Sequence, residues 1–517
     1  MQTFDVISPM TGNKVASYPL MDHGEVLALV KQARDKLESW SKVPVKQRAK
    51  VLARAAEILA DNALHYAGRV AAENGKTRFD ALIADVYASC DIMHYYAENA
   101  EKFLAPVKVK GNPMLPGRRL YYTFEPRGVV AVISPWNYPF CLSAGPVITA
   151  IAAGNTVVLK PSSQTPGSGI IVREILEKAG LPEGVVNVAT GSGSFTGQAL
   201  VDSPGIDMFF FTGSTEVGRR VNIRAAERLV PAIMELGGKD AAIVTKNADL
   251  DHAAHAVAWG AFTNCGQTCI GIEMCLVDRV VHDEFMEKLL KVVSEIKPGT
   301  ACGQVGSMTM QSQLKIVEQQ VADAVEKGAK LLPEDALSCT REGMCYPPVI
   351  LTGVTMDMKL MQDETFGPLL PLIPYDSIDE AVSIANSTPY GLSGSVFTRD
   401  MAEGRMIAAR IRTGSVSIND ALTVFGSPGL PFGGIKESGI GAYHSEAGIR
   451  AFANIKSIIE NSNRAKKEFF HFPAMPGSEE GLAEALRFMF AQGASRKIKS
   501  FFKVLPFLQK MMKEGKG

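Results

Sequence analysis

The stretch IDMFFFTGSTEVGRR, residues 206–220, predicts a buried strand, a turn and the start of a helix. The apolar run ends at Phe211, and Gly213 and Ser214 then supply small turn and capping residues. This order brings free backbone N–H groups and the positive end of a helix to one place, where a pyrophosphate can dock. The signal is weak by itself, because Ser214 or Thr215 could act as an N-cap and nothing more. A GxGxxG fingerprint after the first strand is missing.

Short β-rich runs alternate with helical segments on both sides of this stretch. The runs are GVVAVIS (128–134), NTVVLK (155–160), GVVNVAT (184–190), AAIVTK (241–246), EMCLVDRVV (273–281) and GSVSIND (414–420). Such alternation predicts an α/β fold with two Rossmann-like, parallel-sheet domains, one for a cofactor and one for catalysis, with the site between them. The first hundred residues are helical in pattern, and RRLYYTFEPRG (118–128) predicts a hairpin or an extended arm.

Composition excludes several function classes. The 517 residues carry 54 basic and 54 acidic side chains, so no global field favours nucleic acid. A membrane span is not expected, because no run of about 18 uncharged apolar residues occurs. Eight sparse cysteines and an N-terminus without a signal-peptide pattern favour the reducing cytoplasm.

The last 55 residues, 463–517, differ from the rest. After a linker, two helical pieces are expected at 480–492 and 496–514, the second interrupted at Pro506. This second piece is a basic amphipathic helix. Its apolar residues are Ile498, Phe501, Phe502, Leu505, Leu508 and Met512, and its basic residues are Arg496, Lys497, Lys499, Lys503, Lys510, Lys513 and Lys516. Two interpretations stay open: a helix docked on its own protein or a neighbouring subunit, which we favour, and peripheral contact with an anionic membrane surface.

Six further stretches fit around residues 206–220. They are PWNYPF (135–140), GNTVVLKPSSQTP (154–166), ELGGK (235–239), GQTCIG (266–271), ETFGP (364–368) and PFGGIKESGIG (431–441). In this order and spacing, residues 5–460 resemble the aldehyde dehydrogenase superfamily. The resemblance implies NAD(P)-dependent oxidation of an aldehyde to a carboxylic acid. It also implies a cofactor domain (1–107 and 128–235), a catalytic domain (236–448), a bridging and oligomerisation element (108–127 and 449–462) and, beyond the usual family end, the extension at 463–517.

The resemblance assigns the chemistry to three residues. Cys269 matches the nucleophile that forms a thiohemiacetal and then a thioester, and Glu235 matches the base that activates water to hydrolyse that thioester. The side-chain amide of Asn137 and the backbone N–H of Cys269 would bind the oxyanion. Cys265 is expected to be a packed core thiol, and no metal site is predicted, since no second ligand pair accompanies these cysteines. Gly237 and Gly238 suit a mobile loop.

The cofactor residues follow from the same resemblance: Trp136, Lys160, Gly213, Ser214, Glu364 and Phe366. Ser163 departs from the pattern, because NAD-preferring members usually carry a glutamate there. A serine removes the repulsion that a carboxylate exerts on a 2′-phosphate, so we expect NADP to be accepted alongside NAD.

The substrate expectation is an apolar aldehyde, aliphatic or aromatic. YPFCLSAGPVITA (138–150) and ALTVFGSPGLPFG (421–433) carry no charge, whereas an acidic semialdehyde would need an Arg or Lys at the entrance. Three alternatives stay open: a CoA-acylating enzyme, a succinic-semialdehyde-type dehydrogenase and a non-catalytic, membrane-associated scaffold. A homodimer or homotetramer is expected from the family.

Overall fold

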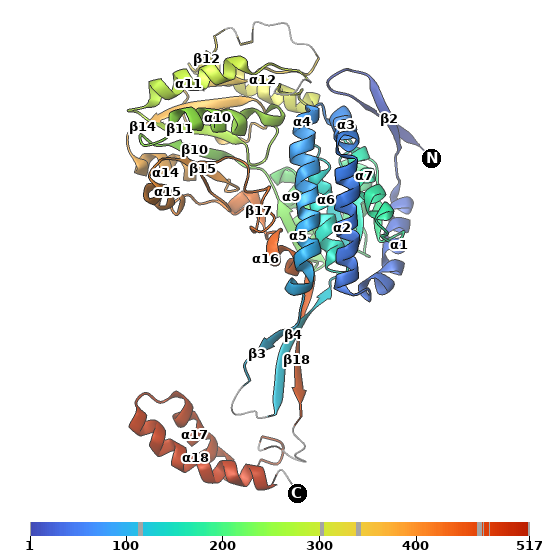
Figure 1. Cartoon of the computed structure of the whole chain (residues 1–517), viewed down its shortest axis with the longest axis vertical. Coiled ribbons are helices and arrows are strands. Elements are labelled where there is room, and N and C mark those ends of the chain that lie inside the picture. The colour runs from blue at the N-terminus through green and yellow to red at the C-terminus, as the bar shows by residue number, and fades with distance from the viewer. Residues whose placement is uncertain are drawn as a thin grey trace. The chain divides into compact units, whose positions relative to one another are not determined.

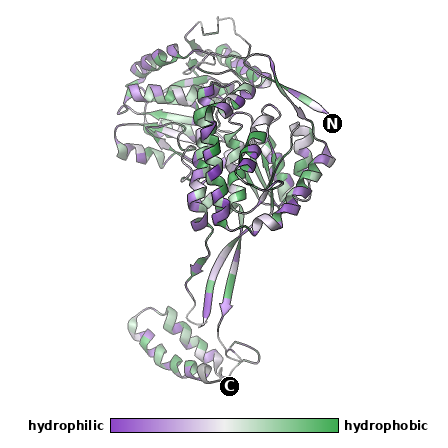
Figure 2. Ribbon diagram, turned by 45° about the vertical axis from the view of Figure 1, so that its right-hand side comes forward, coloured by the Kyte–Doolittle hydropathy of each residue, from purple (hydrophilic) through white to green (hydrophobic). Residues whose placement is uncertain are grey.

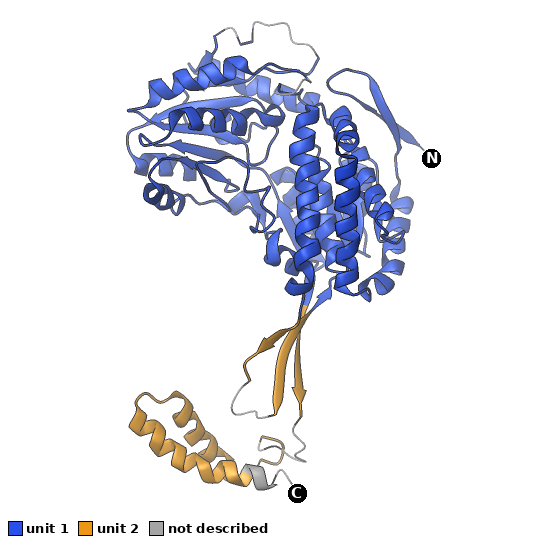
Figure 3. Cartoon of the chain, viewed as in Figure 1, with its two compact units in different colours: residues 1–105, 124–454 blue, residues 106–123, 455–517 orange. Residues whose placement is uncertain are grey.

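The computed structural model describes residues 2–111, 117–299, 304–334, 336–337, 343–462, 468, 470–474 and 476–514. The chain forms two compact units, shown in Figure 3: residues 1–105 with 124–454, and residues 106–123 with 455–517. The first unit contains two large, mainly parallel sheets (Figure 1). The predicted α/β fold class is confirmed.

One sheet has the strand order β17-β9-β8-β5-β6-β7. Its strands are β5 (Val129–Ile133), β6 (Thr156–Lys160), β7 (Val186–Val188), β8 (Met208–Thr212), β9 (Ala232–Glu235) and β17 (Gly439–Ile440). Strands β5 to β9 are parallel, and β17 is antiparallel to β9. The parallel strands follow the doubly wound order 3-2-1-4-5, which places the switch point, where ligands bind in such sheets, between β5 and β8.

Helices cover both faces of this sheet because the side chains of its strands alternate between two cores. Val130 and Val132 of β5 belong to one buried cluster, and Val129 and Ala131 belong to the other. The first face packs against α2 (Val45–Asp61), α3 (Ala63–Asn74), α5 (Ala88–Phe103), α6 (Cys141–Ala152) and α7 (Pro166–Lys178). The second face packs against α1 (His23–Ser41), α8 (Gln198–Asp202) and α9 (Thr215–Glu227).

The other sheet has the order β12-β13-β14-β11-β10-β15-β16. Its strands are β10 (Asp240–Val244), β11 (Ile272–Asp278), β12 (Lys330–Leu332), β13 (Val349–Thr352), β14 (Leu369–Tyr375), β15 (Gly394–Phe397) and β16 (Ser417–Ile418). Two helices, α10 (Leu250–Phe262) and α11 (His282–Glu295), lie on one face. The opposite face packs against α12 (Gln311–Glu326), α14 (Ile378–Asn386) and α15 (Met401–Ala408).

The N-terminal hundred residues are helical from His23 onward, as predicted. The prediction is wrong for residues 3–19, where β1 (Thr3–Ile7) and β2 (Lys14–Pro19) form an antiparallel hairpin. Val6 of this hairpin is buried while its neighbours Asp5 and Ile7 are exposed, so a half-buried strand determines the conformation here.

The second unit holds the outer part of a small sheet and two helices. The sheet has the order β18-β4-β3, with β3 (Val107–Val109) antiparallel to β4 (Arg118–Pro126) and β18 (Ala453–Asn461) beside β4. Residues 118–128, predicted as a hairpin or an extended arm, thus form one extended strand rather than a hairpin of their own. Both tail helices are confirmed, as α17 (Ser478–Phe490) and α18 (Ala494–Glu514). Figure 2 shows apolar and polar residues interleaved along both. The side chains of Met512 and Lys513, and residue Lys516, lie outside the described part of the chain.

The predicted interruption at Pro506 is wrong, because α18 continues through it. A proline inside a helix removes one hydrogen bond but leaves the other turns intact. Here Val504 and Phe507, on either side of the proline, are buried against Ala485 of α17. This packing stabilises the turns before and after Pro506.

Candidate active site

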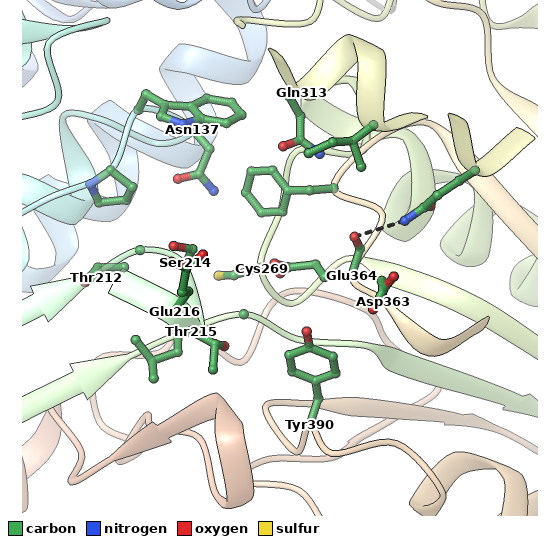
Figure 4. A pocket seen from close by; sticks show the side chains of 18 of the residues that line it. Asn137, Thr212, Ser214, Thr215, Glu216, Cys269, Gln313, Asp363, Glu364 and Tyr390 are labelled. Atoms are coloured by element: carbon green, nitrogen blue, oxygen red, sulfur yellow. Dashed lines mark hydrogen bonds between the residues drawn. The ribbon is translucent and has the colours of Figure 1, made fainter. Parts of the chain in front are cut away.

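A cavity of about 660 Å³ opens at the carboxyl ends of β5, β8 and β9 (Figure 4). Seven of the residues singled out in the sequence line it: Trp136, Asn137, Gly213, Ser214, Cys269, Glu364 and Phe366. They come from the switch point of the first sheet and from loops of the second. Glu235, Lys160 and Ser163 lie outside this lining.

The start of α9 contributes unsatisfied backbone donors to the cavity wall. Ser214 occupies the N-cap position with extended backbone, yet its side chain makes no capping hydrogen bond. Gly213 and Thr215 line the cavity beside it. The first amides of this 13-residue helix therefore remain free for an anionic ligand, and the residues fit the pyrophosphate of a dinucleotide.

An aromatic pair forms another wall. Trp136, after β5, meets Phe366 edge to face, with ring centroids 5.4 Å apart and planes at 90°. Phe366 has a left-handed backbone, with φ of 49°. Glu364 points to the same cavity and accepts a hydrogen bond from the Gly238 N–H at 2.9 Å. Burial, followed by the charge of Glu273, raises the pKa of Glu364.

A buried ion pair holds the 364–366 loop in place. Glu273 of β11 accepts hydrogen bonds from the backbone N–H groups of Thr365 and Phe366 at 2.8–3.0 Å. Lys239 donates to the same carboxylate at 2.7 Å and to the Thr365 hydroxyl at 3.1 Å. Lys239 thus organises the loop that carries Glu364 and Phe366.

The two glycines of ELGGK allow close approach of other residues of the site. A β-carbon on Gly238 would lie 2.3 Å from the Cys269 carbonyl oxygen, and one on Gly237 would lie 2.6 Å from the Glu364 carboxylate. A side chain at Gly238 would therefore meet backbone, and one at Gly237 would displace the Glu364 carboxylate.

Two cysteines of FTNCGQTCIG have different surroundings. Asn264, Cys265 and Gly266 are all left-handed, at φ of 51°, 57° and 70°, and turn the chain sharply after α10. Cys265 is fully buried, with its sulfur 3.8 Å from the Tyr346 carbonyl oxygen. Cys269 is partly exposed and lines the cavity. Burial, followed by the negative charges of Glu364, Asp240 and Glu235, raises the pKa of its thiol.

Asn137 is held beside Cys269 with part of its hydrogen-bonding capacity unused. Its side-chain Nδ2 donates to the Gln267 carbonyl oxygen at 3.0 Å, and its Oδ1 has no partner. An amide carries two hydrogens on Nδ2, so a second donor remains for a ligand atom. Asn137 can therefore donate a hydrogen bond to a ligand in this cavity.

Glu235 ends β9, behind the cavity wall formed by Leu236 and Gly237. It is 4% exposed, and neither of its carboxylate oxygens has a hydrogen-bond partner. Burial raises its pKa well above the ordinary value for a carboxyl group. Its charge also acts on the thiol of Cys269, which indicates that the two groups are near each other.

Lys160 ends β6, on the far side of β5 from β8. Its Nζ donates to the Pro161 carbonyl oxygen at 2.9 Å, and burial lowers its pKa to about 8. In the described part of the chain no carboxylate forms an ion pair with Lys160. Ser163 follows three residues later and is half-buried.

A second cavity, of about 310 Å³, reaches Cys269 from another side. None of its lining residues is charged: Ile83, Ala84, Tyr87, Ala88, Tyr138, Leu142, Trp259, Thr263, Thr268, Cys269, Ile270, Leu422, Thr423, Phe425, Gly426 and Ser427. Residues 138–142 and 422–427 come from the two uncharged stretches expected at an entrance.

The other residues of this apolar wall were not predicted from the sequence. Ile83, Ala84 and Tyr87 lie on η1 (Ala81–Tyr87), one turn of π-helix that leads into α5, and Trp259 lies on α10. A π-helix inserted in a run of helix has no distinct residue pattern, although such turns are frequent at functional sites.

Neither a metal site nor a membrane-spanning helix is seen among the described residues. In the ranges that the structure describes, no group of acidic, His and Cys side chains has the geometry to hold a metal ion. No described helix is long and apolar enough to cross a bilayer.

Comparisons with known proteins identify the family. The aldehyde dehydrogenase family model matches residues 1–458, so the chain belongs to the aldehyde dehydrogenase family. It is an oxidoreductase that uses NAD or NADP.

Three relatives illustrate the range of the family. The chain is 36% identical, over 95% of its length and 92% of the relative, to "4,4'-diapolycopene aldehyde oxidase" of Methylomonas sp. It is 38% identical, over 87% of its length and 86% of the relative, to "Putative succinate-semialdehyde dehydrogenase [NADP(+)] 2" of Mycobacterium ulcerans. The crystal structure of Mycobacterium tuberculosis aldehyde dehydrogenase complexed with NAD+ superposes with a TM-score of 0.83 at 35% identity, over 88% of this chain and 94% of that one.

Proposed function

We propose that the protein oxidises an uncharged, extended apolar aldehyde to its carboxylic acid through a covalent intermediate on Cys269. The observation that carries this proposal is the position of the thiol in the walls of two cavities, one polar and one apolar. The apolar cavity would hold the aldehyde, and the polar cavity, with Ser214, Trp136, Glu364 and Phe366, would hold the dinucleotide.

The Cys269 thiol first loses its proton to water in the cavity. The thiolate then adds to the carbonyl carbon, which forms a C–S bond and turns the carbonyl oxygen into an alkoxide. The free Nδ2 hydrogen of Asn137 and the Cys269 backbone N–H stabilise this oxyanion. A bound nicotinamide cofactor would supply the hydride acceptor for this carbon. Once the hydride has left, the carbonyl group re-forms and the acyl group remains on the Cys269 sulfur as a thioester.

Glu235 completes the reaction as a general base. Burial raises its pKa, which makes its carboxylate a stronger proton acceptor than an exposed one. It removes a proton from water, the resulting hydroxide attacks the thioester carbon, and the Cys269 sulfur leaves as a thiolate. Water rather than CoA is the acceptor, because the base that hydrolysis requires is present beside the thiol.

The substrate class follows from the apolar cavity. An acidic semialdehyde would leave its second carboxylate unpaired in that wall, at a high desolvation cost. The match to the diapolycopene aldehyde oxidase leaves about 26 residues uncovered, fewer than the 55 of residues 463–517, so it reaches into the C-terminal extension. That relative's name gives a diapolycopene aldehyde as its substrate, which supports an extended substrate here.

A substrate series tests this proposal. We expect kcat/KM to rise along straight-chain aldehydes from C2 to C16 and to stay low for succinic semialdehyde, with benzaldehyde as an aromatic reference. NAD(P)H absorbance is the readout, and addition of CoA with analysis for acyl-CoA examines the acylating alternative. Succinic semialdehyde as the best substrate would contradict the proposal.

We also propose that NADP is accepted because Lys160 and Ser163 can bind a 2′-phosphate. Lys160 has no carboxylate partner among the described residues, and Ser163 places no charge beside it. The test compares kcat/KM for the two cofactors in the wild type and in Ser163→Glu. A strong NAD preference that Ser163→Glu leaves unchanged would contradict this part.

The sequence favoured docking of the tail on protein, but the exposed apolar residues of α17 and α18 support the other interpretation. We therefore propose that this pair of C-terminal helices contacts an anionic membrane surface. Leu486, Phe490, Ile498 and Phe502 are 47%, 75%, 57% and 67% exposed although they are large and apolar. Basic residues of α18 (Arg496, Lys497, Lys499, Lys503, Lys510) accompany them. Exposed apolar side chains together with positive charge are typical of interfacial helices.

Vesicle sedimentation of the full-length protein tests this contact. Vesicles with 30% phosphatidylglycerol should retain the wild type, more weakly at high salt, and the triple variant Phe490→Ser, Ile498→Ser, Phe502→Ser should stay in the supernatant. Leu229→Ser and Val280→Ser, which alter even more exposed apolar residues of the first unit, serve as controls. Equal retention of the triple variant contradicts the proposal.

We further propose a homo-oligomer in the reducing cytoplasm. Ile455 and Ile459 of β18 are 65% and 63% exposed on the small sheet, which supports pairing with a second copy. Six cysteines of the described residues are free thiols. Light scattering of Ile455→Lys with Ile459→Lys should show a smaller particle than the wild type.

A further inference from the structure

The loop that carries Asn137 is fixed from outside by a second asparagine. Asn74, at the end of α3, is fully buried. Its Nδ2 donates to the Trp136 carbonyl oxygen at 2.8 Å and lies 3.4 Å from the Asn137 carbonyl oxygen. Asn74 is 62 residues away from this loop in sequence, and neither the cofactor nor the aldehyde site includes it.

Asn74 is itself rigidly oriented. Its Oδ1 accepts a hydrogen bond from the Lys76 N–H at 3.1 Å, which fixes which end of the carboxamide is the donor. Its backbone carbonyl accepts from the Thr309 hydroxyl at 2.7 Å. The Nδ2 group is therefore directed to the loop after β5.

The same network reaches the loop of Cys269. Thr309 N–H donates to Gln267 Oε1 at 2.9 Å, and Gln267 Nε2 donates to the Asn264 carbonyl oxygen at 2.8 Å. Asn264 Nδ2 then donates to the Asn137 carbonyl oxygen at 2.9 Å. Gln267 and Asn264, like Asn74, are fully buried. Three carboxamides thus join the Asn137 loop to the Cys269 loop.

The far end of the Asn137 loop is held as well. Asp85 accepts hydrogen bonds from the Phe140 and Cys141 N–H groups, both at 3.0 Å, and Lys76 donates to its other oxygen at 2.7 Å. The side chains of Lys76 and Asp85 are 0% exposed. Asn74 and Lys76 therefore act on the two ends of residues 136–141.

We propose that Asn74 is a positioning residue that sets the distance between the Asn137 amide and the Cys269 sulfur. It touches no reacting atom, and its effect passes through the Trp136 and Asn137 backbone. An oxyanion donor is effective only when it lies within a few tenths of an ångström of its best position. Loss of the Asn74 hydrogen bond should therefore slow the steps that form or break down the oxyanion. The inference rests on the proposed role of Cys269 and Asn137.

Two variants of Asn74 test it, with Asn155→Ala as the matched control. Asn155 is also fully buried and makes three hydrogen bonds to backbone groups, to Ala150, Phe452 and Gly128, away from both cavities. Asn74→Ala should lower kcat about 10- to 100-fold. The iodoacetamide alkylation rate of Cys269 should change less than about twofold, since the thiol itself is not altered.

Asn74→Asp adds a readout that loss of stability cannot produce. A carboxylate cannot donate to the Trp136 carbonyl, but a protonated carboxyl can. The activity of Asn74→Asp relative to wild type should therefore rise as the pH is lowered, while that of Asn74→Ala stays flat. All variants are assayed well below their melting temperatures.

The outcomes separate the inference from the proposed function. An inactive wild type, or a wild type whose activity survives Cys269→Ala, rejects the proposed function. An active wild type with kcat of Asn74→Ala no lower than that of Asn155→Ala rejects the positioning role. If the activity of Asn74→Asp relative to wild type does not change with pH, the Asn74 side chain does not act as a hydrogen-bond donor to the loop.

Discussion

The ammonium group of Lys239 lies 2.7 Å from a carboxylate oxygen of Glu273, and both side chains are buried. Because the same carboxylate also binds the backbone of residues 365 and 366, this pair couples the loop after β9 to the loop that carries Glu364 and Phe366. Because both groups are buried, solvent hardly screens their charges. Removal of one partner therefore leaves the other as an uncompensated buried charge.

Lys239→Met should lower the free energy of unfolding by about 3 kcal/mol, since Glu273 is then buried without its partner. It should also raise the KM for the dinucleotide, because Glu364 and Phe366 lose their fixed loop. Denaturant unfolding and initial rates measure the two effects. Arg279→Met is the control: its exposed pair with Asp376 should contribute less than about 1 kcal/mol. Equal losses in the two variants would contradict the role of burial.

The two cysteines of residues 262–271 should respond in opposite ways to removal of sulfur. Cys269→Ala should lose at least about 10⁴-fold in kcat while keeping its melting temperature. Cys265→Ala should keep its activity and lose about 1 kcal/mol of stability, because it leaves a small cavity behind the turn. If Cys269→Ala is active, or if folded Cys265→Ala is inactive, the proposed roles of the two cysteines are contradicted.

Glu235→Gln should separate the two halves of the reaction. The first turnover, which forms NAD(P)H, should persist as a burst, and the steady state should slow about 10²- to 10⁴-fold because water is no longer activated. Intact-mass spectrometry should then show an acyl group on the protein. If burst and steady state fall together, Glu235 acts before the thioester rather than after it.

Cofactor choice should depend on pH through Lys160. Burial lowers its pKa to about 8, so raising the pH from 7 to 9 removes its proton in the free enzyme. The neutral amine attracts a 2′-phosphate less, so kcat/KM for NADP should fall relative to that for NAD across this range. Lys160→Met should make the ratio independent of pH. A constant ratio in the wild type would show that Lys160 does not bind the phosphate.

The tail hairpin should depend on Gly481. A β-carbon there would lie 2.2 Å from the ring of Phe507, so Gly481→Leu should separate α17 from α18. Limited proteolysis should then cut the tail faster, while oxidation of a soluble short aldehyde stays unchanged. Leu482→Ala, at a 39% exposed neighbour, should leave the cleavage rate unchanged. Unchanged cleavage in Gly481→Leu would mean that the two helices do not depend on this packing.

The sequence predicted those elements that depend mainly on residues close to one another along the chain. The strand at 208–212 and the helix start at Ser214 follow from an apolar run and small turn residues, and both are confirmed. The six motifs likewise placed Asn137, Glu364 and Cys269 on one site, and these residues do line one cavity.

The features that were missed depend on contacts between distant segments. Asn74 binds backbone carbonyl groups, which every residue type has, so nothing in residues 136–137 signals a partner 62 positions away. Gly237 and Gly238 look like flexible residues in sequence, and the reason for them appears only once Glu364 and the Cys269 carbonyl oxygen are placed beside them. Pro506 was predicted to interrupt a helix because the packing of Val504 and Phe507 against α17 cannot be seen in the sequence.

Among the described residues, Cys269 is the one that the two cavity walls have in common. Compounds that fill the apolar cavity should therefore compete with the aldehyde and not with the dinucleotide, and compounds in the polar cavity should show the reverse pattern. An inhibitor that blocks both ligands at once has to occupy the space at the sulfur itself. Double-inhibition kinetics with one compound for each cavity would accordingly show independent binding.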